Sequence, residues 1–205
     1  MSTAQPLRCP PIMSRATADG LLSALHGAEQ AARLYPAAAD RLAEADLHVI
    51  AHAFRFTAAQ EREHTAVLRG LILAHGGSIR NAPPEDAALP AAPLDLLDAA
   101  IRMEQARLEA LPACAQAAQT EGFPRVAHAL QRMAETENRH MQRFIRYKDA
   151  LARGTLFRAE RRVSWYCLSC GQLHTGCEPP EGCAGCGKGS GHFIRTTYFP
   201  FHAEG

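Results

Sequence analysis

Apolar residues recur at helical spacing along four long stretches of the chain, each rich in Ala, Leu, Arg and Glu. This pattern predicts helices over residues 17–39, 45–75, 94–119 and 123–152. The connection between the second and third helices, residues 78–93, contains four prolines and cannot be helical throughout. Because it is long for a turn, we expect it to cross the length of a four-helix bundle.

The composition changes after Gly154, where Gly, Cys, Pro and aromatic residues replace Ala and Leu. We therefore expect two domains, a helical bundle over residues 1–158 and a small metal domain over residues 159–205. Such a short segment cannot build a large apolar core, so a bound metal must provide much of its folding free energy.

Two Cys-x-x-Cys pairs, Cys167 with Cys170 and Cys183 with Cys186, lie twelve residues apart in the small domain. Four thiolates at this spacing suit tetrahedral Zn²⁺ or a single iron. The spacing alone favours zinc, whereas a role in electron transfer would favour iron, because zinc has no redox chemistry. Since the chain shows no export signal, metal binding is preferred over disulfides.

An internal repeat relates the two halves of the bundle. A shift of 76 residues superposes residues 36–64 on residues 112–140 without a gap. The repeat retains Glu-x-x-His in both copies, as Glu61 with His64 and as Glu137 with His140. Because residues i and i+3 share one helix face, each pair can direct a carboxylate and an imidazole inward together. Two helical hairpins of one design are therefore predicted to form the bundle.

The other two helices each offer a glutamate, Glu29 and Glu104, in the sequence Glu-Gln-Ala. Di-iron bundles use one Glu-x-x-His from each of two helices and a further Glu from each of the other two. The sequence therefore predicts a carboxylate–histidine metal centre. Tyr35, on the face that meets the core, is either a hydrogen-bond donor to a ligating carboxylate or an ordinary core residue.

The formal net charge of +1 and the lack of long charged runs argue against nucleic acid or an anionic membrane surface as a partner. The longest apolar stretch, residues 66–74, is too short to span a bilayer. The first twenty residues lack the apolar core of a secretory signal. We expect a cytoplasmic protein.

Motifs throughout the chain resemble the rubrerythrin family, which implies a ferritin-like four-helix bundle followed by a rubredoxin-like domain. They are Leu21-Leu22-Ser23-Ala24-Leu25, Glu61-Arg62-Glu63-His64, Leu97-Asp98-Ala99-Ala100-Ile101, Glu121-Gly122-Phe123, Cys170-Gly171-Gln172-Leu173-His174-Thr175-Gly176, Pro180-Glu181-Gly182-Cys183 and His192-Phe193. The resemblance implies two irons in the bundle and one iron, or alternatively zinc, in the tetracysteine site. It implies that Glu61 and Glu137 bridge the two irons, that His64 and His140 bind one iron each, and that Glu104 is a terminal ligand.

Two positions depart from the family pattern. The family's first-helix glutamate falls on Ala28, and the nearest carboxylate, Glu29, is rotated by about 100° around the helix. Glu29 can therefore ligate iron only if the helix carries a local bulge. The family also has an extra carboxylate three residues after the third-helix glutamate, and that position is Arg107.

The resemblance implies a non-haem di-iron peroxidase that reduces hydrogen peroxide to water in oxidative-stress defence. Electrons would pass through the tetracysteine iron from rubredoxin or a reductase, within a head-to-tail homodimer. Arg107 makes a ferroxidase or oxygen-reducing oxidase an alternative. A non-catalytic binding protein, with a zinc ribbon and a degenerate di-iron site, is another.

Overall fold

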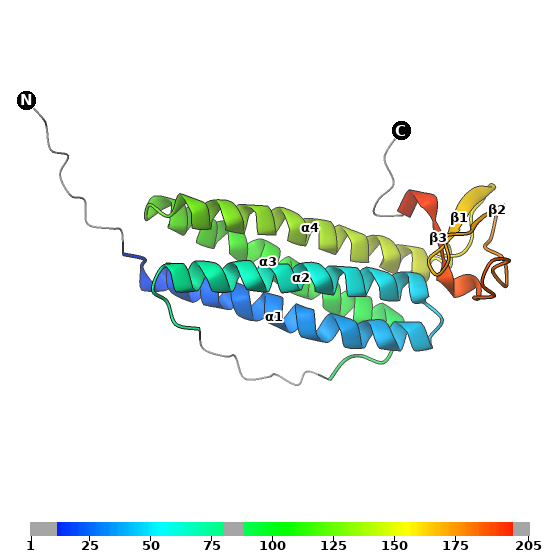
Figure 1. Ribbon diagram of the computed structural model, residues 1–205, viewed down its shortest axis with the longest axis horizontal. Helices are drawn as coiled ribbons and strands as arrows, with labels where there is room; N and C mark the ends of the chain where they lie inside the picture. The colour runs from blue at the N-terminus through cyan, green and yellow to red at the C-terminus, as the bar shows by residue number, and fades with distance from the viewer. Residues whose placement is uncertain (1–11, 80–87, 199–205) are drawn as a thin grey trace, which may run out of the picture.

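The computed structural model describes residues 12–79 and 88–198, and its main body is a bundle of four long helices. They are α1 (Arg15–Glu44), α2 (His48–Ala74), α3 (Pro93–Thr120) and α4 (Pro124–Ala152). α1 and α2 form one antiparallel hairpin and α3 and α4 form the other (Figure 1). The predicted four-helix bundle is confirmed.

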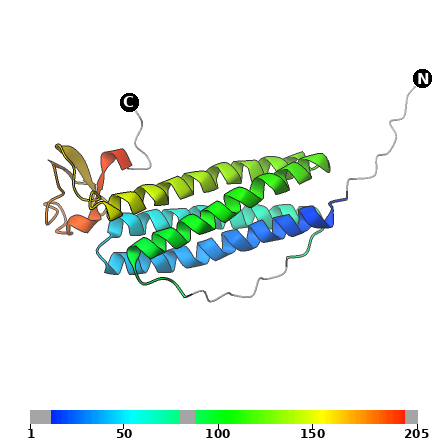
Figure 2. The ribbon, with the colours of Figure 1, turned by 180° about the vertical axis from the view of Figure 1, so that it is seen from behind.

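The connection between the two hairpins joins opposite ends of the bundle. α2 ends where α1 begins, whereas α3 begins beside the far end of α1 (Figures 1 and 2). There Arg41, in the last turn of α1, donates a hydrogen bond of 2.8 Å to the carbonyl oxygen of Pro90, just before α3. The two ends of the connection therefore lie where the predicted crossover needs them, and its residues 80–87 lie outside the described ranges.

The observed helix bounds follow the sequence pattern closely, except at the end of α1. This helix continues to Glu44, beyond the predicted end at residue 39, because Leu42 is fully buried and extends the apolar face by one more turn. The chain then leaves the helix at Asp46, whose φ of 57° lies in the left-handed region.

The core is divided into two apolar clusters by a layer of buried polar side chains. One cluster includes Tyr35, Phe54 and Phe144, and the other includes Leu25 and Leu130. The polar side chains come from the middle of α2, α3 and α4, between the helical turns that contribute to the two clusters. Burying so many polar groups in an apolar core is costly unless they are paired or bind a metal.

The C-terminal module contains a three-stranded antiparallel sheet of order β2-β1-β3 at the end of the bundle where α2 begins (Figure 1). Its elements are β1 (Val163–Cys167), β2 (Leu173–Gly176), η1 (Ser190–His192), β3 (Phe193–Arg195) and η2 (Thr196–Tyr198). The predicted domain boundary between residues 158 and 159 falls between α4 and β1 and stays a prediction.

Contacts at the start of α2 hold the module against the bundle. The rings of His48 and His192 stack with their centroids 3.6 Å apart. Gly191 approaches Asp46 so closely that a Cβ atom there would lie 2.0 Å from the carbonyl oxygen of Asp46, so only glycine fits. None of the helices in the described ranges combines the length and apolarity of a membrane span.

Candidate metal centres

Four predicted ligands meet in the buried polar layer of the bundle. Glu61 from α2, Glu104 from α3, and Glu137 and His140 from α4 each place one ligand atom within 4.8 Å of the others. All four side chains are buried, with relative exposures of 0 or 1%. Three carboxylate oxygens and one imidazole nitrogen around a common point suit a divalent metal such as iron.

The ring of His140 is oriented for metal binding. Its Nε2 lies 2.9 Å from Oε1 of Gln60, an acceptor, so Nε2 carries the hydrogen. Nδ1 is buried and faces carboxylates, 3.1 Å from Oε1 of Glu61 and 3.5 Å from Oε2 of Glu104. A polar group that fixes one ring nitrogen and leaves the other facing carboxylates is typical of a metal-ligating histidine.

His64 lies on the other side of Glu61 and Glu137. Its Nδ1 is 3.0 Å from Oε1 of Glu137 and 3.5 Å from Oε2 of Glu61. These are the oxygens that point away from His140, because Oε2 of Glu137 and Oε1 of Glu61 face that ring. Glu61 and Glu137 therefore separate a position beside His140 from a second position beside His64, as bridging carboxylates would.

Glu29 is not brought to this cluster. Its carboxylate forms an ion pair with Arg69, and its side chain is 25% exposed. α1 is an uninterrupted α-helix without a bulge, so Ala28 takes the buried position and is 2% exposed. Ligation by Glu29, which the sequence allowed only through a local bulge, therefore finds no support in the geometry of α1.

Arg107 lies inside the cluster and is 8% exposed. Its Nη2 is 2.6 Å from Oε2 of Glu104, 3.0 Å from Oε2 of Glu137 and 3.1 Å from Oε1 of Glu61. Nε donates a second hydrogen bond to Oε2 of Glu137. The guanidinium thus touches the same three oxygens that face His140. The sequence showed an arginine at this position but not that its guanidinium points into the cluster.

The cluster perturbs the pKa values of its members. Burial opposes the charged form of both histidines, but hydrogen bonds to the surrounding carboxylates raise the pKa of His64 to about 9 and that of His140 to about 10. Burial raises the pKa of Glu104 to about 7. For Glu61 and Glu137 burial acts in the same direction, yet hydrogen bonds from the two histidines and the Arg107 charge leave both pKa values lowered. A bound metal must therefore displace protons from the histidines.

Tyr35 supports Glu104 from α1. Its hydroxyl donates a hydrogen bond of 2.5 Å to Oε1 of Glu104, whereas Oε2 faces the cluster. Burial, followed by the Glu104 charge, raises the pKa of Tyr35, so the hydroxyl remains a donor. Of the two roles that the sequence left open, the structure favours the support of a candidate ligand.

Replacing Tyr35 by phenylalanine is expected to weaken metal binding by the bundle by about 10–100-fold, because loss of a hydrogen bond that orients a ligand has this effect. Anaerobic titration with Mn²⁺ measures the change. Tyr147→Phe is the matched control, since Tyr147 is also a buried tyrosine but lies outside the cluster. Equal affinities for the two variants would show that the Tyr35 hydroxyl does not orient Glu104.

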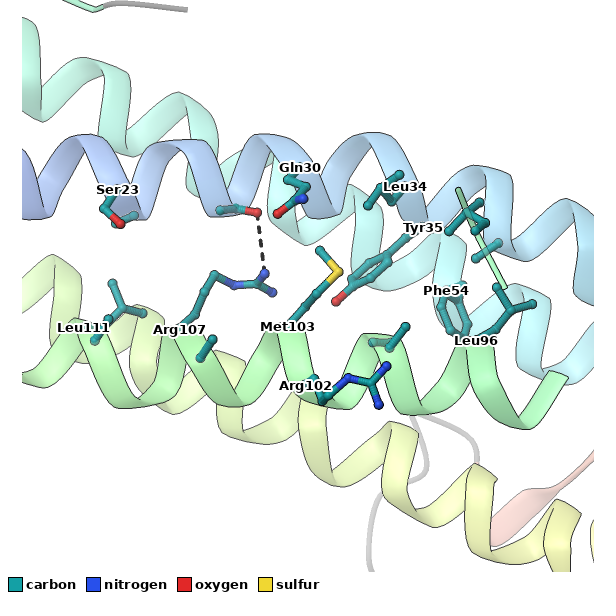
Figure 3. A pocket seen from close by; sticks show the side chains of 18 of the residues that line it. Ser23, Gln30, Leu34, Tyr35, Phe54, Leu96, Arg102, Met103, Arg107 and Leu111 are labelled. Carbon is teal, nitrogen blue, oxygen red and sulfur yellow. Dashed lines mark hydrogen bonds between the residues drawn. The ribbon is translucent and has the colours of Figure 1, made fainter. Parts of the chain in front are cut away.

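A largely apolar cavity of about 650 Å³ lies between α1 and α3, beside the cluster. Arg107 and Tyr35 both line it, and Figure 3 shows the Arg107 side chain extending from α3 toward α1. A molecule in the cavity would therefore meet the two side chains that hydrogen-bond Glu104.

The four predicted cysteines of the small module also come together. The Sγ atoms of Cys167 and Cys186 are 3.8 Å apart, those of Cys170 and Cys183 are 3.5 Å apart, and all four lie within 4.8 Å of one another. A tetrahedron of sulfurs at metal–sulfur distances of about 2.3 Å has edges of about 3.8 Å, whereas a disulfide needs about 2.05 Å. The arrangement therefore suits a mononuclear metal. Cys177 is exposed and lies outside the cluster.

A glycine follows each cysteine pair, Gly171 after the first and Gly187 after the second. Gly171 and Gly187 have φ values of 80° and 73°, in the left-handed region. Their backbone N–H groups donate to the carbonyl oxygens of Cys167 and Cys183, closing the two turns that hold the sulfurs.

Comparisons with known proteins point to one family. The family model described as Rubrerythrin matches residues 19–93 and 95–164. A rubrerythrin of Clostridium perfringens is 30% identical over 189 residues, which cover 89% of this chain and 96% of the relative. A rubrerythrin of Porphyromonas gingivalis is 28% identical over 185 residues, with 89% of this chain and 92% of the relative covered.

Among solved structures, nigerythrin in a mixed-valence state superposes with a TM-score of 0.60 at 22% identity, covering 95% of this chain and 97% of its own. Mycobacterium tuberculosis bacterioferritin, BfrA, superposes with a TM-score of 0.65 at 13% identity, covering 69% of this chain and 89% of its own. At these identities the likeness concerns the fold, and it agrees with a ferritin-like bundle.

Proposed function

Because the chain belongs to the rubrerythrin family, we propose that it is an oxidoreductase that reduces hydrogen peroxide to water at the bundle centre. Electrons would reach this centre from an iron held by the four cysteines. The observation that carries the proposal is the presence in one chain of a buried carboxylate–histidine cluster and a tetracysteine cluster. The family implies an iron-dependent protein of oxidative-stress defence, and peroxide as the oxidant is our proposal.

The residues of the bundle centre have distinct roles in this proposal. Iron held by Glu61, Glu104, Glu137 and His140 would supply electrons to the O–O bond, whose cleavage to two waters takes two electrons and two protons. Tyr35 and Arg107 line the cavity and hydrogen-bond Glu104. They are therefore placed to orient a small polar oxidant.

The distance between the centres supports electron delivery from a second copy of the chain. The module contacts α2 at His48, thirteen residues before Glu61, which corresponds to about 20 Å along the helix. Electron transfer falls steeply with distance. We therefore propose a head-to-tail homodimer in which the module of one subunit serves the bundle of its partner. Rubredoxin or a reductase would be the external donor.

The proposal is tested by mixing anaerobically reduced, iron-loaded protein with hydrogen peroxide or dioxygen at equal concentration. We expect peroxide to oxidise both centres faster, with the return of thiolate-to-ferric absorption in the tetracysteine site. Glu137→Gln, which removes a ligand oxygen, should abolish the reaction. Faster oxidation by dioxygen would instead support an oxidase, the alternative that Arg107 raises.

Metal analysis of protein purified anaerobically from iron-replete cells, before any iron loading, tests the third alternative. Zinc in the tetracysteine site together with little iron in the bundle would support a non-catalytic binding protein. Iron in both centres, with no reaction toward either oxidant, would exclude both the peroxidase and the oxidase.

A further inference from the structure

We infer that the bundle binds a single metal ion, at the position beside His140, and that the guanidinium of Arg107 is the second cation of the centre in place of a second iron. The inference goes beyond the proposed function and holds whichever oxidant is reduced. It rests on the donor atoms, the buried charges and the space around Arg107.

The two metal positions in the cluster are unequal. The position beside His140 has three carboxylate oxygens, from Glu61, Glu104 and Glu137, and one imidazole nitrogen. The position beside His64 has only that imidazole and the remaining oxygens of Glu61 and Glu137. A set of two shared carboxylates and one imidazole leaves a second metal without a carboxylate of its own.

The two residues that could complete the second position do not do so. On α1 the buried position is Ala28, and the neighbouring Glu29 turns outward to pair with Arg69. On α3 the residue one turn after Glu104 is Arg107, a cation. Neither position therefore adds a carboxylate, and among the described residues the cluster has only the three glutamates for its metal ions.

The charges of the buried side chains also indicate one metal ion in the bundle. The three carboxylates of the cluster carry at most three negative charges, and Arg107 neutralises one of them through contacts of 2.6–3.1 Å. With both histidines neutral, one divalent ion neutralises the remaining two. A second divalent ion would leave two uncompensated positive charges in a buried site, which is strongly unfavourable.

Arg107 has room to withdraw when the metal binds. Its Nη2 contacts the three oxygens that would ligate the ion, so these contacts must lengthen. The side chain also lines the cavity between α1 and α3, where Nη1 donates to the carbonyl oxygen of Gly27 at 3.5 Å (Figure 3). A small shift toward α1 would keep the guanidinium beside the carboxylates as a fixed positive charge.

The test counts metal ions in the full chain with zinc in the tetracysteine site. Mn²⁺ is titrated anaerobically, because it prefers carboxylate over thiolate ligands and is visible by electron paramagnetic resonance. We expect one Mn²⁺ per chain, with the spectrum of an isolated ion. Two ions with the spectrum of an exchange-coupled pair, or no binding at all, would overturn the inference.

A double variant, Ala28→Glu with Arg107→Glu, restores carboxylates at both departures and is expected to bind two Mn²⁺ ions as a coupled pair. Arg102→Glu is the control, because it makes the same charge change as Arg107→Glu at an exposed position of α3 and should still bind one. A folded double variant that binds only one ion would also contradict the role of these two positions. If it does not fold, the count in the unaltered chain still decides.

These outcomes separate the inference from the proposed function. Two ions in the unaltered chain would overturn the single-metal centre but leave the reduction of peroxide possible. One ion, with no reaction of the iron-loaded protein toward peroxide, would do the reverse.

Discussion

Replacing Cys183 by serine is expected to unfold the C-terminal module while the helical bundle stays folded. The buried core of the module consists of Trp165, Phe193 and two of the metal-binding cysteines, so little remains without the metal. Metal binding by such small sites contributes on the order of 10 kcal/mol to folding. Trp165, the single tryptophan of the chain and fully buried, reports the change as a red shift of its fluorescence.

Cys177→Ser is the matched control, because Cys177 is exposed and belongs to no metal cluster among the described residues. It should leave the fluorescence unchanged, and helical circular dichroism should be nearly the same in both variants. If Trp165 remains buried in Cys183→Ser, the module is held by its contacts with the bundle rather than by a metal. Chelation of the unaltered protein should reproduce the effect of Cys183→Ser.

Replacing Arg107 by methionine is expected to destabilise the metal-free bundle by about 3–5 kcal/mol, the usual cost of removing one partner from a buried ion pair. Methionine retains much of the side-chain volume, so the loss is one of charge. The carboxylates of Glu61, Glu104 and Glu137 then rely on the two histidines alone for compensation. Denaturant unfolding in the presence of a chelator measures the effect.

The same variant should lose most of this destabilisation when Mn²⁺ is present, because the metal supplies the missing positive charge. Arg102→Met, at an exposed position of the same helix, should change stability little under either condition. An Arg107→Met protein as stable without metal as the unaltered chain would mean that the guanidinium does not neutralise the cluster.

The sequence by itself determined the tetracysteine site. Two Cys-x-x-Cys pairs, each followed by a glycine, place their sulfurs through local backbone geometry, so spacing is sufficient to predict the cluster. The observed sulfur distances and the positive φ values of Gly171 and Gly187 follow from it. The cysteine spacing does not distinguish iron from zinc, because both ions accept the same four thiolates.

The sequence also determined the four helices and most of the bundle centre. Apolar periodicity fixed which helix faces turn inward, and the repeat placed Glu61 and Glu137 at equivalent positions of two hairpins. Because the inward faces of the four helices meet along the axis of a bundle, Glu104 and His140 are brought to Glu61 and Glu137. The predicted end of α1 at residue 39 is wrong, because burial of Leu42, a tertiary contact, stabilises the last turns of the helix.

Only the tertiary structure decided how the two departures from the family pattern act. The sequence showed an arginine at position 107 and a shifted carboxylate at position 29, but a long side chain can point toward or away from a cluster. Packing of α1 against α3 directs the guanidinium of Arg107 onto three carboxylates and leaves Glu29 to Arg69. The physical reason is that a buried charge is paired with side chains of other helices. A sequence pattern shows only which residues share a face of the same helix.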